Sequence, residues 1–255
     1  MKTRQLLLKL AKKFPKRYAK KEGDFVGLMT GKLPEEIHNI VLCLDFDWQV
    51  LPFIEEKKPD IIITHHPFIY GSKFKVFKLD KSKEALCQKV DDLGIPVYSY
   101  HTNFDRGKDG MNDALAEALE LGNVYSPVGE SMMRIGYLKE EMPIRQFANY
   151  AKTKLGMDYG LLLTNGRPMI KKVGIIGGGG SKYWPIAKEE GCDIYISGDA
   201  PHHIRRAMVN ENFNYLDIPH EVEKIFMPQM KKILLEIDPS LNILTVDYQK
   251  LPEVI

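Results

Sequence analysis

Histidines and carboxylates follow three predicted strands of this chain, at the points where those strands end. His65 and His66 come directly after three isoleucines and a threonine, and Pro67 then stops the strand. A second apolar run is followed by His101 and Asp105, and a third by His220 with two glutamates. Ligands of open α/β sheets bind outside the carboxyl ends of the strands. Neutral imidazole is also the commonest metal-ligating side chain, so the three clusters predict a metal site.

The types of these side chains indicate which metals would suit them. Imidazole and carboxylate together favour Zn, Fe, Mn or Ni, whereas Ca and Mg prefer shells made of oxygen alone. On extended backbone His65 and His66 would point to opposite sides, an arrangement that suits two divalent metal ions better than one. Asp105 would bridge the ions. Such a pair can lower the pKa of a bound water to about 7, which is a common hydrolase arrangement.

The alternative is that these histidines are separately hydrogen-bonded residues of turns and core. A His-His pair alone favours that alternative, because buried polar groups usually find local partners. Three clusters at three strand ends favour the metal site, provided that the strands share one sheet and their ends converge.

Four glycines at 177–180, followed by Ser181, suggest a second kind of site, because helix N-termini bind anions. The Lys-Ser/Thr pair of a Walker motif is absent, and a dinucleotide-binding spacing is not matched. Two interpretations stay open, a tight backbone passage beside the cleft and a contact with a substrate phosphate.

Strands and helices alternate throughout the chain, which predicts α/β layers. Near residue 125 the sequence changes to residues typical of loops, and we therefore expect two α/β units. The predicted division is a discontinuous metal-site domain (1–125 and 219–255) and a second domain (126–218). The predicted strands are 40–44, 61–64, 97–100, 134–138, 159–164, 173–176, 193–197, 214–218 and 242–248. The predicted helices include 48–57, 82–93, 143–155, 184–190 and 202–210.

Composition and charge exclude several classes of protein. The 255 residues are 44% hydrophobic and 27% charged, which is ordinary for a globular protein. A net charge of +2 gives no electrostatic footprint for nucleic acid, and no apolar run is long enough to span a membrane. Cys43, Cys87 and Cys192 lie in apolar segments, which predicts buried thiols and a cytoplasmic location.

Taken together, these motifs resemble one known family. The chain is similar to the NIF-three-like proteins (NGG-one-interacting-factor-three-like), which are also called GTP cyclohydrolase I type 2 homologues. The matching segments keep the family's order over nearly the whole chain; they are 24–28, 44–45, 63–67, 101–105, 110–113, 173–181, 197–199 and 218–220. The paired histidines and the His-Thr-Asn-x-Asp motif at 101–105 are the most specific of them.

The resemblance implies a NIF-three-like fold, with two α/β units of mixed sheets flanked by helices around a dinuclear metal centre. It also implies a toroidal homohexamer. The implied ligands are His65, His66, Asp105, His220 and a nearby glutamate.

The glutamate departs from the family's pattern. It usually lies four residues after the last histidine, where this chain has Lys224. Glu223, three residues after His220, would lie on the same helical face and is the preferred ligand. Glu221 is the alternative. His101 would lie beside the metals, as a proton carrier or as a group that supports a ligand.

By resemblance, the expected function is a metal-dependent hydrolase that uses a metal-activated water. The implied reaction is of the GTP cyclohydrolase I type 2 kind, on a nucleotide or another small molecule. His101 and Glu223 would move protons, since neighbouring metals can tune their pKa values. The alternative from another class is a non-catalytic metal-binding hexamer that serves as a scaffold or regulator.

Overall fold

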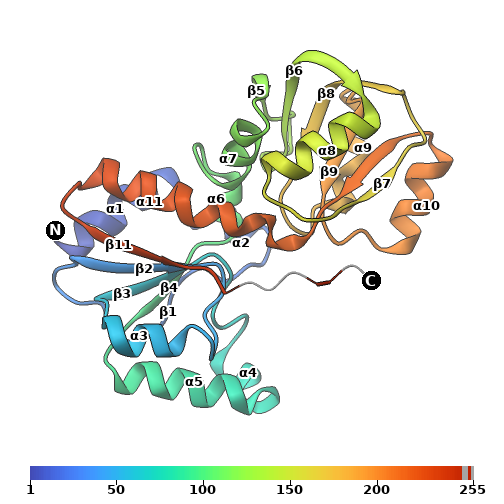
Figure 1. Ribbon diagram of the computed structural model, residues 1–255. Helices are drawn as coiled ribbons and strands as arrows, with labels where there is room; N and C mark the ends of the chain where they lie inside the picture. The colour runs from blue at the N-terminus through green and yellow to red at the C-terminus, as the bar shows by residue number, and fades with distance from the viewer. Residues whose placement is uncertain (249–251, 254–255) are drawn as a thin grey trace. The chain divides into compact units, whose positions relative to one another are not determined.

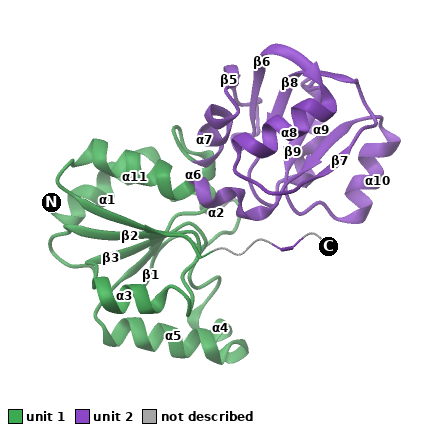
Figure 2. Cartoon of the chain, in the orientation of Figure 1, with its two compact units in different colours: residues 1–110, 226–249 green, residues 111–225, 250–255 purple. Residues whose placement is uncertain are grey.

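The structure is a computed structural model that describes residues 1–248 and 252–253. It divides into two compact units (Figure 2). Unit 1 comprises Met1–Gly110 and Phe226–Gln249, and unit 2 comprises Met111–Ile225 and Lys250–Ile255. Each unit has its own mixed sheet with flanking helices, which confirms the predicted α/β class.

The sheet of unit 1 has the strand order β1-β4-β3-β2-β11. Four neighbouring strands run parallel, and β1 is an antiparallel edge strand. The bounds are β1 (Gly27–Thr30), β2 (Asn39–Cys43), β3 (Ile61–Thr64), β4 (Val97–Ser99) and β11 (Asn242–Val246).

Helices cover both faces of this sheet, which is why β3 reads as an uninterrupted apolar run. In Figure 1, α1 and α11 lie over one face, and α3 and α5 over the other. Leu51 and Ile54 of α3 join Leu86 and Val90 of α5 in a core cluster that includes Ile62. The helices are α1 (Thr3–Lys13), α2 (Arg17–Lys21), α3 (Leu51–Lys57), α4 (Lys73–Leu79), α5 (Lys81–Asp92), α6 (Thr102–Arg106) and α11 (Phe226–Ile237).

The sheet of unit 2 has the order β5-β6-β8-β9-β10-β7, in which β8, β9 and β10 run parallel. Side chains of α9 and α10 pack into one core cluster with this sheet, and α7 and α8 contact β6 and β8. The strands are β5 (Gly122–Tyr125), β6 (Arg134–Pro143), β7 (Leu161–Leu163), β8 (Met169–Ile175), β9 (Ile194–Ser197) and β10 (Asn214–Asp217). The helices are α7 (Met111–Ala118), α8 (Ile144–Lys154), α9 (Trp184–Glu189) and α10 (His202–Asn210), with 3₁₀ helices η1 (Ser181–Tyr183) and η2 (His220–Ile225).

The condition that the three histidine-bearing strands share one sheet is not met. β3 and β4 pair in unit 1, whereas β10 pairs with β9 and β7 in unit 2. The compact units also change over at 110/111 and 225/226 rather than near 125 and 219. The reason is that α7 packs on β6 and η2 contacts α7, so both elements join unit 2. His220 and Glu223 therefore belong to unit 2.

In the described part of the chain, none of the helices combines the length and hydropathy that a bilayer span requires.

Candidate metal site

Three histidines gather at the carboxyl ends of β3 and β4 in unit 1. The ring centroids of His65 and His66 are 5.0 Å apart, and that of His101 lies 5.2 Å from the first and 5.7 Å from the second. One ring nitrogen from each lies within 4.8 Å of the other two. Imidazole nitrogens bind zinc at about 2 Å, so donors on one ion lie up to about 4 Å apart. The cluster is therefore close to the spacing of a metal site.

The two adjacent rings are neighbours, and the expectation that they point to opposite sides is wrong. β3 ends at Thr64, and His65 and His66 lie in a bend rather than on extended backbone. The Thr64 hydroxyl donates to the carbonyl of His66 at 2.7 Å and so stabilises this bend. The backbone amides of His65 and His66 donate to carbonyls of Cys43 and Leu44 at the end of β2.

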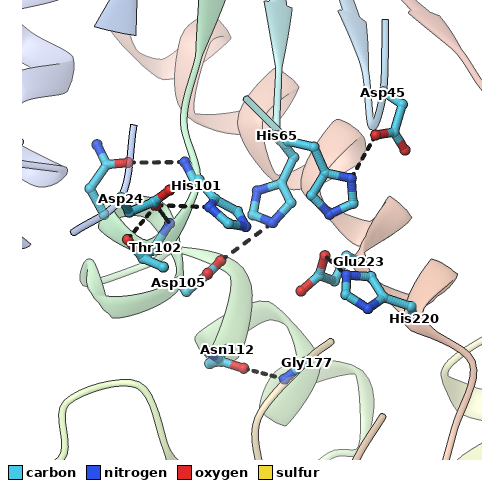
Figure 3. Close-up of polar contacts among 12 residues, drawn as sticks. Asp24, Asp45, His65, His101, Thr102, Asp105, Asn112, Gly177, His220 and Glu223 are labelled. Carbon is cyan, nitrogen blue, oxygen red and sulfur yellow. Dashed lines mark hydrogen bonds and ion pairs between the residues drawn. The ribbon is translucent and has the colours of Figure 1, made fainter. Parts of the chain in front are cut away.

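Two of these histidines each rest against a carboxylate through Nδ1. His66 Nδ1 is 2.8 Å from an oxygen of Asp45, and His101 Nδ1 is 2.8 Å from an oxygen of Asp24 (Figure 3). An ionised carboxylate only accepts hydrogen bonds, so each Nδ1 carries the proton and each Nε2 keeps its lone pair. Carboxylate–histidine pairs of this kind orient the histidines that bind metals.

Hydrogen bonds keep the carboxylate of Asp24, the partner of His101, in its ionised form. Burial raises the pKa of its carboxyl, but hydrogen bonds from His101, Thr102 and the amide of Phe25 outweigh burial, and the pKa falls below its usual range. The Thr102 hydroxyl donates to Asp24 at 2.7 Å, and the Phe25 amide does so at the same distance.

His65 and Asp105 form the buried part of the cluster. His65 is fully buried, Asp105 is 5% exposed, and Nε2 of the histidine lies 3.7 Å from a carboxylate oxygen of Asp105 (Figure 3). Phe104 and Phe226 flank the imidazole, with ring centroids at 6.5 and 5.3 Å. An apolar wall lowers the local dielectric and strengthens the attraction between a cation and these donors.

Unit 2 contributes a second group, built on η2. In a 3₁₀ helix the side chains at i and i+3 eclipse, and His220 Nε2 lies 3.1 Å from Glu223 (Figure 3). His220 Nδ1 contacts Asp199 at 2.5 Å. The hydrogen bond with Glu223, aided by Asp199, raises the pKa of His220 to about 9 against the cost of burial. Glu223 is therefore the carboxylate beside His220; its role as a ligand stays a prediction.

The glycine run passes tightly beside this second group. Gly178 has φ +63°, and a Cβ there would collide with the Glu223 carboxylate and lie 3.2 Å from His220 Nε2. The Gly178 carbonyl accepts from the Gly198 amide at 2.7 Å. The Gly177 amide donates to the side chain of Asn112 (Figure 3). These contacts favour the backbone-passage interpretation of residues 177–180.

Three carboxylates of the candidate site were not predicted as site residues. Asp45 and Asp199 follow β2 and β9, so the strand-end rule that identified the histidines could also have found them. Asp24 precedes β1, an edge strand whose sequence gives no strand signal. All three lie in segments that resemble the NIF-three-like family, but the resemblance did not imply a role for them.

The family model Duf34/NIF3 (NGG1p interacting factor 3) matches residues 1–252 of this chain. The chain belongs to the Duf34/NIF3 family. A Lactococcus lactis relative, named GTP cyclohydrolase 1 type 2 homolog, is 29% identical over 247 residues that cover 95% of each chain. A Clostridium perfringens relative of the same name is 32% identical over 210 residues, 78% of this chain and 79% of its own.

Solved structures of other proteins have the same fold. A Bacillus cereus protein related to NIF3 has a TM-score of 0.88 at 22% identity, covering 100% of this chain and 99% of its own. Reduced HcgD from Methanocaldococcus jannaschii has a TM-score of 0.79 at 25% identity, covering 97% and 98%.

Proposed function

We propose that this protein is a dinuclear-metal-dependent hydrolase of the GTP cyclohydrolase I type 2 kind. Two groups of side chains supply its metal ligands, one in each unit. In unit 1 the ligands are His65, His66 and Asp105, and in unit 2 they are His220 and Glu223. His101 carries protons beside the first group.

One observation carries this proposal. His66, His101 and His220 each place Nδ1 against a carboxylate, of Asp45, Asp24 and Asp199 respectively. Three histidines with the same orientation need a common explanation, and separately hydrogen-bonded turn residues do not supply one. At His66 and His101 the proton on Nδ1 leaves an Nε2 lone pair in a fixed direction, which is what metal binding requires, whereas Nε2 of His220 shares with Glu223 a proton that a metal ion would displace.

The chain's own residues have separable tasks in this function. Asp45 and Asp24 fix the ring orientation and tautomer of His66 and His101. Glu223 and His101 hold and move protons at their carboxylate and Nε2 atoms. The bound metal ions would act as Lewis acids and lower the pKa of a water. The names of the relatives support a nucleotide such as GTP as the substrate.

Metal content tests the ligand assignment directly. We expect the purified protein, loaded in turn with Zn, Mn, Fe and Ni, to hold two ions per chain by elemental analysis. His65→Ala should lower this content, because it removes a fully buried donor. His38→Ala is the matched control, since the side chain of His38 is 62% exposed and lies outside the cluster. Full metal content in His65→Ala would remove His65 from the ligand set.

Turnover tests the hydrolase assignment. GTP and a panel of phosphoesters are incubated with the metal-loaded protein and with His65→Ala and His101→Ala. We expect hydrolysis by the unaltered chain, its loss in His65→Ala, and a fall of about 10²-fold or more in His101→Ala if this residue moves a proton. Two bound ions without turnover on any substrate would favour the non-catalytic scaffold instead.

A further inference from the structure

Unit 1 has a pocket of about 260 Å³ beside the residue that orients His101. Asp24 and Phe25 line it from the segment that precedes β1. Three lysines also line it; they are Lys16 and Lys20 at α2 and Lys73 at the start of α4.

Lys16 and Lys20 form a like-charged pair on one helical face. The Lys20 amide donates to the Lys16 carbonyl at 3.1 Å, which confirms the i,i+4 spacing at which like charges repel each other. Among the residues that the structure describes, neither side chain forms an ion pair with a carboxylate. Lys73 adds a third ammonium, which donates to the Thr30 hydroxyl at 2.7 Å. A pocket with this excess of cations favours an anionic ligand.

The ammonium of Lys16 has a defined position. It lies 5.4 Å from the centroid of the Tyr98 ring, within the range of a cation–π contact. Gly27 has φ +109°, and a Cβ there would collide with the Lys16 ammonium. The absence of a side chain at residue 27 thus leaves room for this head group.

The carboxylate among these lining residues does not neutralise the lysines. The side chain of Asp24 is 2% exposed, and its oxygens accept from His101, Thr102 and the Phe25 amide. Its charge therefore faces the histidine, as Figure 3 shows.

An aromatic pair flanks the lysines. Phe25 is 41% exposed and Tyr70 is 61% exposed, and their ring centroids lie 5.4 Å apart in an edge-to-face arrangement. Large aromatic side chains that stay this exposed offer a surface for a planar ring of a ligand.

We propose that this pocket binds an aromatic phosphate ester. Lys16, Lys20 and Lys73 hold the phosphoryl oxygens, and Phe25 and Tyr70 contact the ring. Its use as the phosphate end of a substrate rests on the hydrolase function proposed above, whereas the binding itself does not.

The test is calorimetric titration of the full chain with phenyl phosphate, inorganic phosphate and phenol. We expect phenyl phosphate to bind more tightly than inorganic phosphate, and phenol to give no measurable binding. Lys16→Gln/Lys20→Gln should weaken phenyl phosphate binding at least tenfold, because two charged donors are lost. Lys9→Gln/Lys12→Gln is the matched control, with the same charge change at two exposed lysines of α1 outside the pocket. Equal affinity in the two double variants would overturn the proposal.

Two further variants separate this site from the metal ligands and test the aromatic flank. His65→Ala should bind phenyl phosphate as the unaltered chain does. Loss of binding in His65→Ala, with normal binding in Lys16→Gln/Lys20→Gln, would show that the anion binds at the metal site. That result would refute the proposed pocket and leave the proposed hydrolase function intact. Phe25→Ala should weaken phenyl phosphate binding and leave inorganic phosphate unchanged, and an equal loss of both would remove the aromatic flank.

Discussion

Histidine orientation is the residue-scale property on which the candidate site depends. Each of three imidazoles is turned by a carboxylate that is itself supplied by a different loop. The buried thiols contrast with this arrangement. Cys43, Cys87 and Cys192 are all buried, as predicted, and burial raises the pKa of Cys192 to about 12. The pKa values of the other two thiols are also raised by burial, so all three are protonated at neutral pH.

The carboxylate behind His101 gives the first prediction. Asp24→Asn keeps an accepting oxygen but removes the charge that fixes the tautomer of His101, whose ring supports the proposed ligands His65 and His66, and we expect metal affinity to fall by about tenfold to a hundredfold. Competition with a coloured chelator measures this change. Asp60→Asn is a suitable control, because Asp60 also accepts two backbone amides, of His38 and Asn39, away from the cluster. A fall of the same size in both variants would mean that Asp24 acts only on the backbone.

Asp217 gives a prediction about pH. Burial raises the pKa of its carboxyl from 3.8 to about 6, although the Ala200 amide and Arg205 oppose this change. Because the folded pKa lies above the unfolded value, the stability from this group is fully present below pH 3.8 and is lost as pH rises through about 6. Asp217→Asn should therefore stabilise the protein at pH 8 by about 1 kcal/mol, discounted for partial exposure, and leave it unchanged at pH 3.5. Melting curves at both pH values test this, and equal melting temperatures at pH 8 would contradict it.

At the scale of elements, burial on both faces made some segments easy to predict. The isoleucine run became β3 with its three isoleucines fully buried, and the helix predicted over 202–210 coincides with α10. β1 and β5 were missed because both are glycine-bearing edge strands without an apolar run; β1 is partly exposed, and every residue of β5 is exposed. α4 was missed because none of its residues is buried, so no helical period of apolar residues appears. Strand pairing could not be predicted either. The sequence of β10 indicates that it is a strand, but not which sheet it joins.

The glycine loop between β8 and η1 gives an element-scale prediction. Gly178→Ala puts a side chain at φ +63° and against the Glu223 carboxylate, so it should cost about 1 kcal/mol in backbone strain and also lower metal content. Gly191→Ala is the matched control, with φ +72° and no atom within 4 Å of its Cβ. We expect similar backbone strain in both, by melting temperature, and reduced metal only in Gly178→Ala. Unchanged metal in both would separate the loop from the site.

At the scale of the whole molecule, the family could be identified from eight short segments, because each lies at a strand end or a turn. The distribution of the candidate ligands over the two units could not be predicted, since it depends on where α7 and η2 pack. For this reason the three strand ends do not lie in one shared sheet. The ligand set that the resemblance implies stays a prediction, because it depends on motif order and not on strand pairing.

Assembly is the prediction for the whole molecule, and it comes from the family resemblance. We propose that the chain forms a homohexamer. Light scattering coupled to size-exclusion chromatography should then give a mass of about 175 kDa, six times the 29.2 kDa of one chain. A mass near that of one chain at micromolar concentration would contradict this proposal.

The backbone hydrogen bonds between the strands continue past the end of β3, and this has a consequence for the entropy of metal binding. The amides of His65 and His66 are already bonded to Cys43 and Leu44, and the Thr64 hydroxyl anchors the bend between them. The loss of backbone entropy at these two donors is therefore incurred when the sheet forms, not when an ion arrives. If unit 1 binds a metal as proposed, binding would start from donors that are already in place, as in a preorganised host molecule.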